Sequence, residues 1–160
     1  MSIVKKNKCI EFAMLSESVY RTFLDLIKYE LDSAGIIDIN PIQAAVLLNI
    51  VNADQIAKGD VLKKGYYMGS NASYNLNKMK ENGYIDQIQS EFDKRISYLR
   101  LTDKGVRLSD SLNEKISSHS QSIESNTSEK TTNIGKLITQ LRSVENHWKK
   151  TINTANRISQ

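Results

Sequence analysis

The segment from Glu91 to Gly105, EFDKRISYLRLTDKG, constrains the fold more than any other part of this chain. It begins with a charged run, Asp93 to Arg95, and continues into Ser97–Leu101, where apolar and polar side chains alternate as in a strand with one buried face. Thr102 then supplies an N-cap for a helix. Because charged side chains stay in water, we expect a hairpin whose tip reaches beyond the protein body and whose return strand is anchored in the core.

Two helices separated by a short turn precede this hairpin. The only proline, Pro41, follows Asn40, so Asn40 is expected to cap a helix that continues to about Val51 and is apolar on nearly all sides. A further helix is predicted from Ser70 to Asn82, where Gly83 ends it. Helix, turn, helix and hairpin in this order make a winged helix-turn-helix, the arrangement of many DNA-binding domains.

Smaller elements complete this middle region. Ile56 and Ala57 are expected to form a brief strand, and a short helix that starts at Gly59 and Asp60 is stopped by Gly65. The outgoing strand of the hairpin is predicted at Tyr84–Gln89, followed by the polar loop Ser90–Arg95. The return strand is anchored by two leucines on its inner face, Leu99 and Leu101.

Long amphipathic helices are predicted at both ends of the chain. The first covers residues 11–34 and ends at Gly35. The helix capped by Thr102 is expected to run from Asp103 to about His119, and residues 117–133, rich in Ser, Asn and Thr, are expected to be a frayed helix end or a loop. A last stripe repeats at steps of three and four residues, as in a short coiled-coil seam: Ile134, Leu137, Leu141, Val144 and Trp148.

The apolar faces of these terminal helices are larger than a lone winged helix can cover, so a second copy of the chain is the expected cover. The residues predicted to meet in such a dimer are Phe12, Leu15, Ile134, Leu137, Leu141, Val144 and Trp148. The predicted fold class is therefore mainly α with a small β-hairpin wing, a winged helix-turn-helix with terminal dimerisation helices. Residues 1–38 and 102–160 form the helical dimerisation region, and residues 39–101 form the DNA-binding region.

The helix predicted from Ser70 to Asn82 has two faces of different chemistry. Ala72, Leu76 and Met79 share one arc and should pack inward. The rest of its surface offers groups that hydrogen-bond to base edges or phosphates: Ser70, Asn71, Ser73, Tyr74, Asn77 and Lys78. A polar helix face alone is also typical of a solvated surface; the charged hairpin beside it is what favours contact with DNA.

The charged hairpin tip supplies the second group of candidate DNA contacts. Arg95, with Lys94 beside it, is expected to enter the minor groove, because a slim guanidinium fits a narrow groove of high negative potential. Asp93 is assigned a structural role, since a carboxylate there repels phosphate unless it pairs with an arginine or caps the loop.

Charge and composition narrow the class of partner. The net charge is +4, and residues 58–107 hold ten Lys/Arg against six Asp/Glu, which suggests an anionic partner for this segment or a solvated surface. No apolar run is long enough to cross a membrane. The single cysteine, Cys9, is consistent with a reducing cytoplasm, and the two histidines lack partners at zinc-ligand spacing, so neither metal nor cofactor is expected.

The pattern D-x-R-x5-L-T-x2-G, formed by Asp93, Arg95, Leu101, Thr102 and Gly105, resembles the signature of MarR-family transcriptional regulators. The run Gly83-Tyr84-Ile85 is similar to the helix-to-wing junction of that family. The resemblance covers the whole chain. It implies a homodimer with interlocked terminal helices on a pseudo-palindromic operator, with Arg95 in the minor groove and the helix from Ser70 to Asn82 in the major groove.

Within the family, LKKGYYMGSNASYNL is most similar to alphaproteobacterial LdtR-type regulators linked to cell-wall L,D-transpeptidase genes. One departure affects the turn: the family has a more regular, acidic helix where this chain has Gly59 and the Tyr66-Tyr67 pair. The resemblance also implies a small aromatic or phenolic effector, for which the conceivable lining residues are Tyr20, Arg21, Tyr66 and Tyr67, although ordinary packing explains these side chains equally well.

Three other readings remain open or are disfavoured. Cys9 follows Lys5, Lys6 and Lys8, which favour a thiolate, so a redox-sensing regulator is one alternative. A winged helix that binds only proteins is another, although it does not need a basic wing. An enzyme is disfavoured because the sequence has no phosphate-binding glycine loop, no H-E-x-x-H motif and no catalytic pairing for His119.

Overall fold

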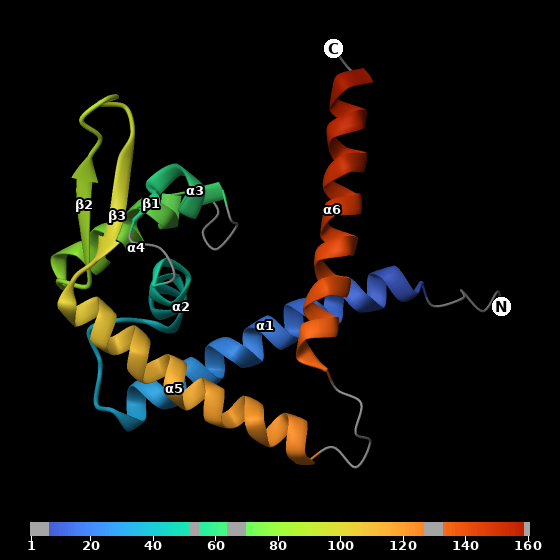
Figure 1. Ribbon diagram of the computed structural model, residues 1–160, viewed down its shortest axis with the longest axis horizontal. Helices are drawn as coiled ribbons and strands as arrows, with labels where there is room; N and C mark the ends of the chain where they lie inside the picture. The colour runs from blue at the N-terminus through green and yellow to red at the C-terminus, as the bar shows by residue number, and fades with distance from the viewer. Residues whose placement is uncertain (1–6, 52–54, 64–69, 127–132, 159–160) are drawn as a thin grey trace. The chain divides into compact units, whose positions relative to one another are not determined.

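The computed structural model describes residues 7–51, 55–63, 70–126 and 133–158 (Figure 1). The chain divides into two compact units, residues 1–115 and 116–160. The predicted Gly65 stop and the Tyr66-Tyr67 pair lie outside the described residues. No helix in the described ranges combines the length and the apolarity that crossing a membrane requires.

The first unit begins with the long helix α1, Lys8–Ser33. It starts three residues before the predicted position because the Asn7 side chain accepts a hydrogen bond from the Cys9 backbone N–H at 2.9 Å and caps the helix. Its end is close to the prediction: the N–H of Gly35 donates to the carbonyl of Asp32, and the N–H of Ile36 donates to that of Leu31.

Helix α2, Pro41–Ile50, is the centre of the first unit, as predicted. Asn40 and Gln43 form a reciprocal capping box, in which each side chain accepts from the backbone N–H of the other residue. The helix is buried on most sides because its apolar residues leave almost no polar face: Ala44, Ala45, Val46, Leu47 and Ile50 are all buried.

Two short elements and a longer helix follow α2. Strand β1 is Ile56–Ala57, helix α3 is Lys58–Lys63, and helix α4 is Ser70–Glu81. Gly83 adopts a positive φ of 74° after α4, and the Tyr84 N–H donates to the Met79 carbonyl at 2.9 Å. The predicted glycine stop is therefore confirmed.

The hairpin consists of β2, Ile85–Gln89, and β3, Ser97–Leu101, which pair antiparallel from Ile85 opposite Leu101 to Gln89 opposite Ser97. Strand β1 pairs on the other edge of β3, with Ile56 opposite Leu99, so the sheet order is β1-β3-β2. Leu99 is fully buried and Leu101 is half-buried. In Figure 1 the β2–β3 turn lies at the opposite end of the hairpin from the start of α5.

Helix α5, Asp103–Asn126, is longer than predicted. The expectation of a helix end near His119 was wrong for residues 120–126, because a polar Ser-rich sequence does not by itself break a helix that lacks proline and glycine. In the second unit, helix α6 spans Ile134–Ile158. Its apolar stripe includes exposed side chains, Leu137, Leu141 and Trp148 among them.

Candidate nucleic-acid interface

Helix α4 separates its side chains into a buried and an exposed face. Ala72, Leu76 and Met79 are buried, which confirms the inward arc. The exposed face carries amide, hydroxyl and phenol groups: Asn71, Ser73, Tyr74 and Asn77. Ser70 opens the helix, but its side chain lies outside the described residues. The exposed face thus combines donors and acceptors, and the carboxylate on this helix is that of Glu81 at its end.

Lys78 also lies on α4, where it is half-exposed and joined to a carboxylate. Its Nζ is 2.6 Å from Oε2 of Glu81, three residues later. The hydrogen bond to Glu81 and the negative charge of that residue raise the pKa of Lys78, so the lysine is charged at neutral pH. Sequence reasoning placed Lys78 among the phosphate-binding groups without this partner, which offsets part of its charge.

The two helices α2 and α4 are joined by a polar link. Gln43, which is buried, donates through Nε2 to Oδ1 of Asn75 at 2.9 Å. The Asn40 side chain donates to the same oxygen at 3.5 Å. Asn75 therefore fixes the exposed face of α4 relative to the start of α2. The sequence contained no signal for this contact, because Asn75 lies between the apolar and polar arcs of α4.

The tip of the hairpin positions Arg95 through Asp93. Oδ1 of Asp93 accepts from the Arg95 backbone N–H at 2.9 Å and from Nε of the Arg95 side chain at 3.2 Å. Oδ2 of Asp93 accepts from Nη2 of the same guanidinium at 3.3 Å. The hydrogen bonds from the Arg95 side chain and then from its backbone lower the pKa of Asp93. The Arg95 side chain is 91% exposed. The carboxylate thus orients the arginine without removing it from solvent.

The base of the hairpin is held by the residues of the L-T-x2-G pattern. The Thr102 hydroxyl donates to the Gly83 carbonyl at 2.6 Å and accepts from the Gly105 N–H at 3.2 Å, so the predicted N-cap is confirmed. Gly105 packs directly on the backbone of Tyr84: a Cβ at this position would lie 2.2 Å from the Tyr84 carbonyl oxygen. The pattern requires glycine there because no side chain fits.

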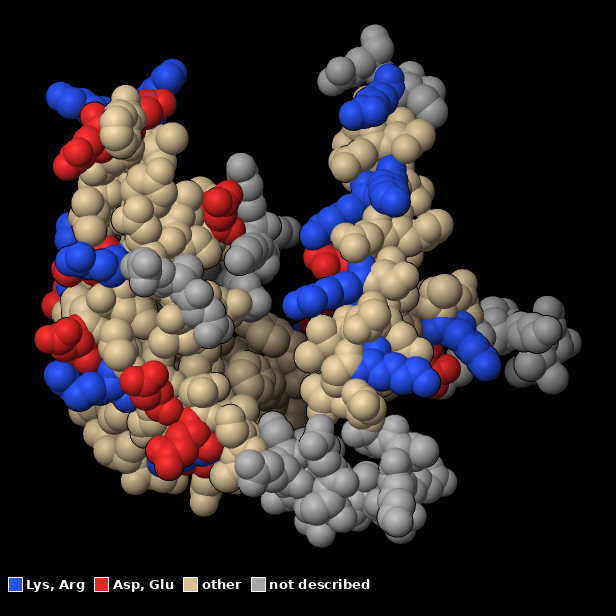
Figure 2. Space-filling view, viewed as in Figure 1, with Lys and Arg blue, Asp and Glu red and all other residues tan. Residues whose placement is uncertain are grey.

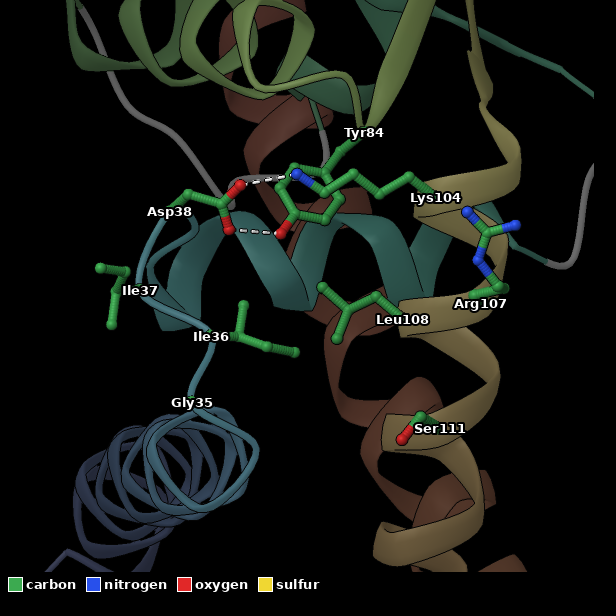
Figure 3. Close-up of a pocket in the computed structure, with 9 residues that line it drawn as sticks. All are labelled: Gly35, Ile36, Ile37, Asp38, Tyr84, Lys104, Arg107, Leu108 and Ser111. Atoms are coloured by element: carbon green, nitrogen blue, oxygen red, sulfur yellow. Dashed lines mark hydrogen bonds and ion pairs between the residues drawn. The ribbon is translucent and has the colours of Figure 1, made fainter.

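A polar cluster ties this base to the linker between α1 and α2 (Figure 3). The Tyr84 hydroxyl donates to Oδ1 of Asp38 at 2.6 Å, and Lys104 Nζ lies 2.6 Å from Oδ2. The same ammonium donates to the Asn82 carbonyl at 2.9 Å and lies 4.1 Å from the centre of the Tyr84 ring. The Asn82 side chain donates to the Asp38 carbonyl. Three segments, the α1–α2 linker, the α4–β2 junction and the start of α5, therefore meet at Asp38.

The ionisation of the cluster follows from these contacts. The hydrogen bond from Lys104 and then that from Tyr84 lower the pKa of Asp38. Burial, followed by the hydrogen bond to Asp38, raises the pKa of the Tyr84 phenol. At neutral pH the cluster is therefore a carboxylate, a neutral phenol and an ammonium. Sequence reasoning identified Tyr84 as a junction residue but missed Asp38 and Lys104. These two residues lie far from each other in the sequence, and neither belongs to a recognisable motif.

The charge distribution at the hairpin is mixed. Lys and Arg side chains lie beside Asp and Glu side chains at the end of the hairpin (Figure 2). Phe92 at the tip is fully exposed. The tip therefore presents individual cations for contact rather than a broad positive surface, and Arg95 and Lys94 are the cations nearest its end.

The remaining predicted site residues lie elsewhere. Tyr20 is half-buried on α1, and the next residue, Arg21, is exposed and pairs with Glu17 at 2.6 Å. Cys9 is exposed in the first turn of α1. Of the predicted dimer residues, Leu15 on α1 is exposed and Phe12 is half-buried. On α6, Ile134 and Val144 are half-buried.

Comparison with known proteins identifies the same region. Residues 37–96, from the α1–α2 linker to the wing tip, match the model of the MarR family. The exopolysaccharide II synthesis transcriptional activator ExpG of Rhizobium meliloti (strain 1021) is 43% identical over 98 residues, 61% of this chain and 50% of ExpG. The chain thus matches about half the length of this curated relative.

Solved structures share the fold. NadR in complex with 4-hydroxyphenylacetate has a TM-score of 0.70 at 15% identity, over 91% of this chain and 96% of NadR. Reduced AbfR bound to DNA has a TM-score of 0.64 at 19% identity, over 90% of this chain and 94% of AbfR. The family model matches residues 37–96, and the solved structures share the fold of the chain.

Proposed function

We propose that this MarR-type winged-helix protein regulates transcription by binding duplex DNA as a homodimer on a pseudo-palindromic operator. The observation that carries the proposal is the pairing of two exposed elements in one sheet-and-helix unit. These are the polar face of α4 and a wing tip on which Asp93 orients a solvent-exposed Arg95. A major groove admits one helix, and the flanking minor groove admits an arginine.

The residues assigned to DNA are those predicted from the sequence, and all of them except Ser70, whose side chain lies outside the described residues, are exposed or half-exposed. In the major groove we place the residues of the exposed α4 face, and in the minor groove we place the two basic residues of the wing tip, with Asp93 as the group that orients Arg95. The full set is Ser70, Asn71, Ser73, Tyr74, Asn77, Lys78, Lys94 and Arg95.

Exposed apolar side chains on the terminal helices support the dimer. Leu15 and Val19 are exposed on α1, as are Leu137 and Leu141 on α6. A second copy of the chain would bury these side chains and set the two wings at a spacing matched to the operator. Sedimentation of the full chain at micromolar concentration tests this directly: a monomer there contradicts the dimer.

The genes controlled are proposed to serve the cell envelope. The resemblance to LdtR-type regulators favours cell-wall L,D-transpeptidase genes as targets. The similarity to ExpG favours genes for exopolysaccharide synthesis. We also propose a small aromatic or phenolic effector, in line with the 4-hydroxyphenylacetate bound by NadR. The proposed location is the cytoplasm, where the operator is.

The alternatives are a protein-binding winged helix and a regulator that senses oxidants through Cys9. Genome-wide footprinting of the purified protein, followed by affinity measurements on the sites found, distinguishes a DNA-binding regulator from a winged helix that binds only proteins. DNA binding predicts a site with two related half-sites and an affinity that falls steeply with salt concentration. Affinity without sequence preference contradicts the proposal. Operator affinity unchanged by peroxide excludes the role of Cys9.

A further inference from the structure

The side-chain amide of Asn75 on α4 is held in one orientation by two residues at the start of α2. Its Oδ1 accepts from Nε2 of Gln43 at 2.9 Å and from Nδ2 of Asn40 at 3.5 Å. Nδ2 of Asn75 has no hydrogen-bond partner among the residues that the structure describes. The amide therefore has its acceptor occupied and its N–H donors available.

This orientation follows from two backbone groups, because a backbone N–H can only donate. The Asn40 N–H donates to Oε1 of Gln43 at 3.1 Å, so the other end of the Gln43 amide is its NH2 group. The Gln43 N–H donates to Oδ1 of Asn40 at 2.9 Å, which fixes the Asn40 amide in the same way. Both NH2 groups point at one atom of Asn75, and only its oxygen can accept from them. Gln43 is 5% exposed, so water competes little for these hydrogen bonds.

Asn75 borders the proposed DNA-binding face of α4. It is half-buried, and helical spacing places it one turn after Asn71 and one turn before Lys78, both of which belong to that face. Its available donors therefore lie beside the groups that are proposed to meet DNA.

We propose that Asn75 is a specificity-determining residue that donates a hydrogen bond to an acceptor on the operator and cannot accept one from it. This inference rests on the proposed function. Such acceptors are N7 and O6 of guanine and O4 of thymine in the major groove, and the phosphate oxygens of the backbone. The bidentate contact of an asparagine with adenine is excluded, because it needs the Oδ1 that Gln43 and Asn40 occupy. Gln43 is then a positioning residue, which sets the end of Asn75 that faces the operator.

The variant Gln43→Glu should reverse this orientation and keep the link between α2 and α4. Glutamate is common at this position of a capping box, so it still accepts from the Asn40 N–H and should preserve α2. A carboxylate cannot donate to Oδ1 of Asn75, so the Asn75 amide should turn and donate to the glutamate through Nδ2. Oδ1 then faces the operator and accepts from N4 of cytosine or N6 of adenine.

Two further variants complete the set. Asn75→Ala removes both ends of the amide, and the fold should tolerate it because Asn75 is half-buried and alanine favours a helix. Gln87→Glu on β2 is the control for charge, since it makes the same exchange at an exposed glutamine outside the residues assigned to DNA.

The orientation of the amide is tested first without DNA, by NMR on the full chain. We expect the side-chain amide protons of Gln43 to exchange with solvent at least about tenfold more slowly in the unmodified protein than in Asn75→Ala, because the hydrogen bond to Asn75 protects them. Equal exchange rates in the two proteins overturn the link between Gln43 and Asn75.

The contact with DNA is tested by selecting half-sites from a pool of randomised duplexes. We expect the unmodified protein and Gln87→Glu to prefer guanine or thymine at one position of each half-site. Asn75→Ala should lose about tenfold of that preference and keep the preferences at other positions, and Gln43→Glu should prefer cytosine or adenine there. A role of Gln43 in folding alone does not reverse a base preference.

A phosphate acceptor gives a second pattern. Asn75→Ala and Gln43→Glu then weaken the affinity for every sequence alike, and a methylphosphonate at one operator position weakens binding of the unmodified protein but not of Asn75→Ala. Unchanged affinity and preference in Asn75→Ala overturn the contact, and the same result in Gln43→Glu overturns the role of Gln43. A pool from which the unmodified protein selects no sequence refutes the proposed function and the contact together, while the exchange experiment still decides the orientation of the amide.

Discussion

The two ends of the β2–β3 hairpin are held in different ways. At the tip, the hydrogen bonds of Asp93 and Arg95 connect residues within one short loop, and the Arg95 side chain is 91% exposed. At the base, Tyr84 is 2% exposed and bonds to Asp38, 46 residues earlier in the chain. Long-range contacts fix the base, whereas local contacts only orient the tip. Substitutions at the base should therefore change folding stability strongly, and substitutions at the tip should change DNA binding more than stability.

The largest effect is expected at the base, in Gly105→Ala. The new methyl group would lie 2.2 Å from the Tyr84 carbonyl oxygen, a backbone atom that moves only with the strand. The free energy of unfolding, measured by urea denaturation, should fall by about 3 kcal/mol or more. Operator binding should be lost with the fold.

The matched control is Gly59→Ala in α3, where a Cβ meets nothing within 4 Å. Because alanine favours a helix over glycine, the stability of this variant should be unchanged or slightly higher. Equal losses in the two glycine variants would show that the contact between Gly105 and Tyr84 is not what holds the base.

The second largest effect is expected for operator affinity, on substitution at the hairpin tip. Arg95→Ala should weaken operator affinity at a fixed salt concentration by about 2 kcal/mol and leave the free energy of unfolding within about 0.5 kcal/mol of the original value. Fluorescence anisotropy with a labelled operator and urea denaturation measure the two quantities. Arg21→Ala is the control, an exposed arginine on α1 with an ion pair to Glu17. Unchanged affinity in Arg95→Ala would contradict the wing assignment.

The contrast between tip and base also separates what sequence could predict from what it could not. Elements specified locally were found: the capping pair Asn40 and Pro41, the glycine stop at Gly83, the alternating strand Ser97–Leu101 and the buried arc of α4. Each depends on residues within one or two turns of chain. The helix end expected near His119 was wrong, because side-chain polarity carries less information than glycine or proline about where a helix ends.

Contacts between distant segments were not predicted. Asp38, Asn82 and Lys104 are exposed or half-exposed polar residues with no pattern of spacing, and only the fold brings them to Tyr84. The residues proposed to contact DNA could be named from the sequence because one helix and one turn contain them all.

A third prediction tests one hydrogen bond at the base of the hairpin without changing the packing of the side chain. Tyr84→Phe removes only the hydroxyl that donates to Asp38 at 2.6 Å, so the free energy of unfolding should fall by about 1 kcal/mol. Tyr98→Phe on β3 is the control, since the Tyr98 hydroxyl forms no hydrogen bond among the described residues and its loss should have little effect. A similar loss in both variants would mean that the hydrogen bond to Asp38 contributes nothing specific.

The smallest effect is expected in the pH dependence of folding stability that two carboxylates contribute. Asp38 contacts the base of the hairpin, and Asp93 lies at its tip. The pKa of Asp38 is lowered in the folded protein, so its contribution to stability is present above the unfolded value of about 4 and is lost as pH falls through the folded value. Urea denaturation at pH 6, 4.5 and 3 should therefore show that the stability advantage of the original protein over Asp38→Asn shrinks as the pH falls.

Asp93→Asn, at the tip, should show the same sign, because the pKa of Asp93 is lowered as well. The change should be smaller than for Asp38→Asn, since the Arg95 partner is in solvent whereas the Asp38 carboxylate is held by both Tyr84 and Lys104. A larger acid dependence at the tip than at the base would reverse the comparison: the local pair, and not the long-range cluster, would then be the main electrostatic support of the hairpin.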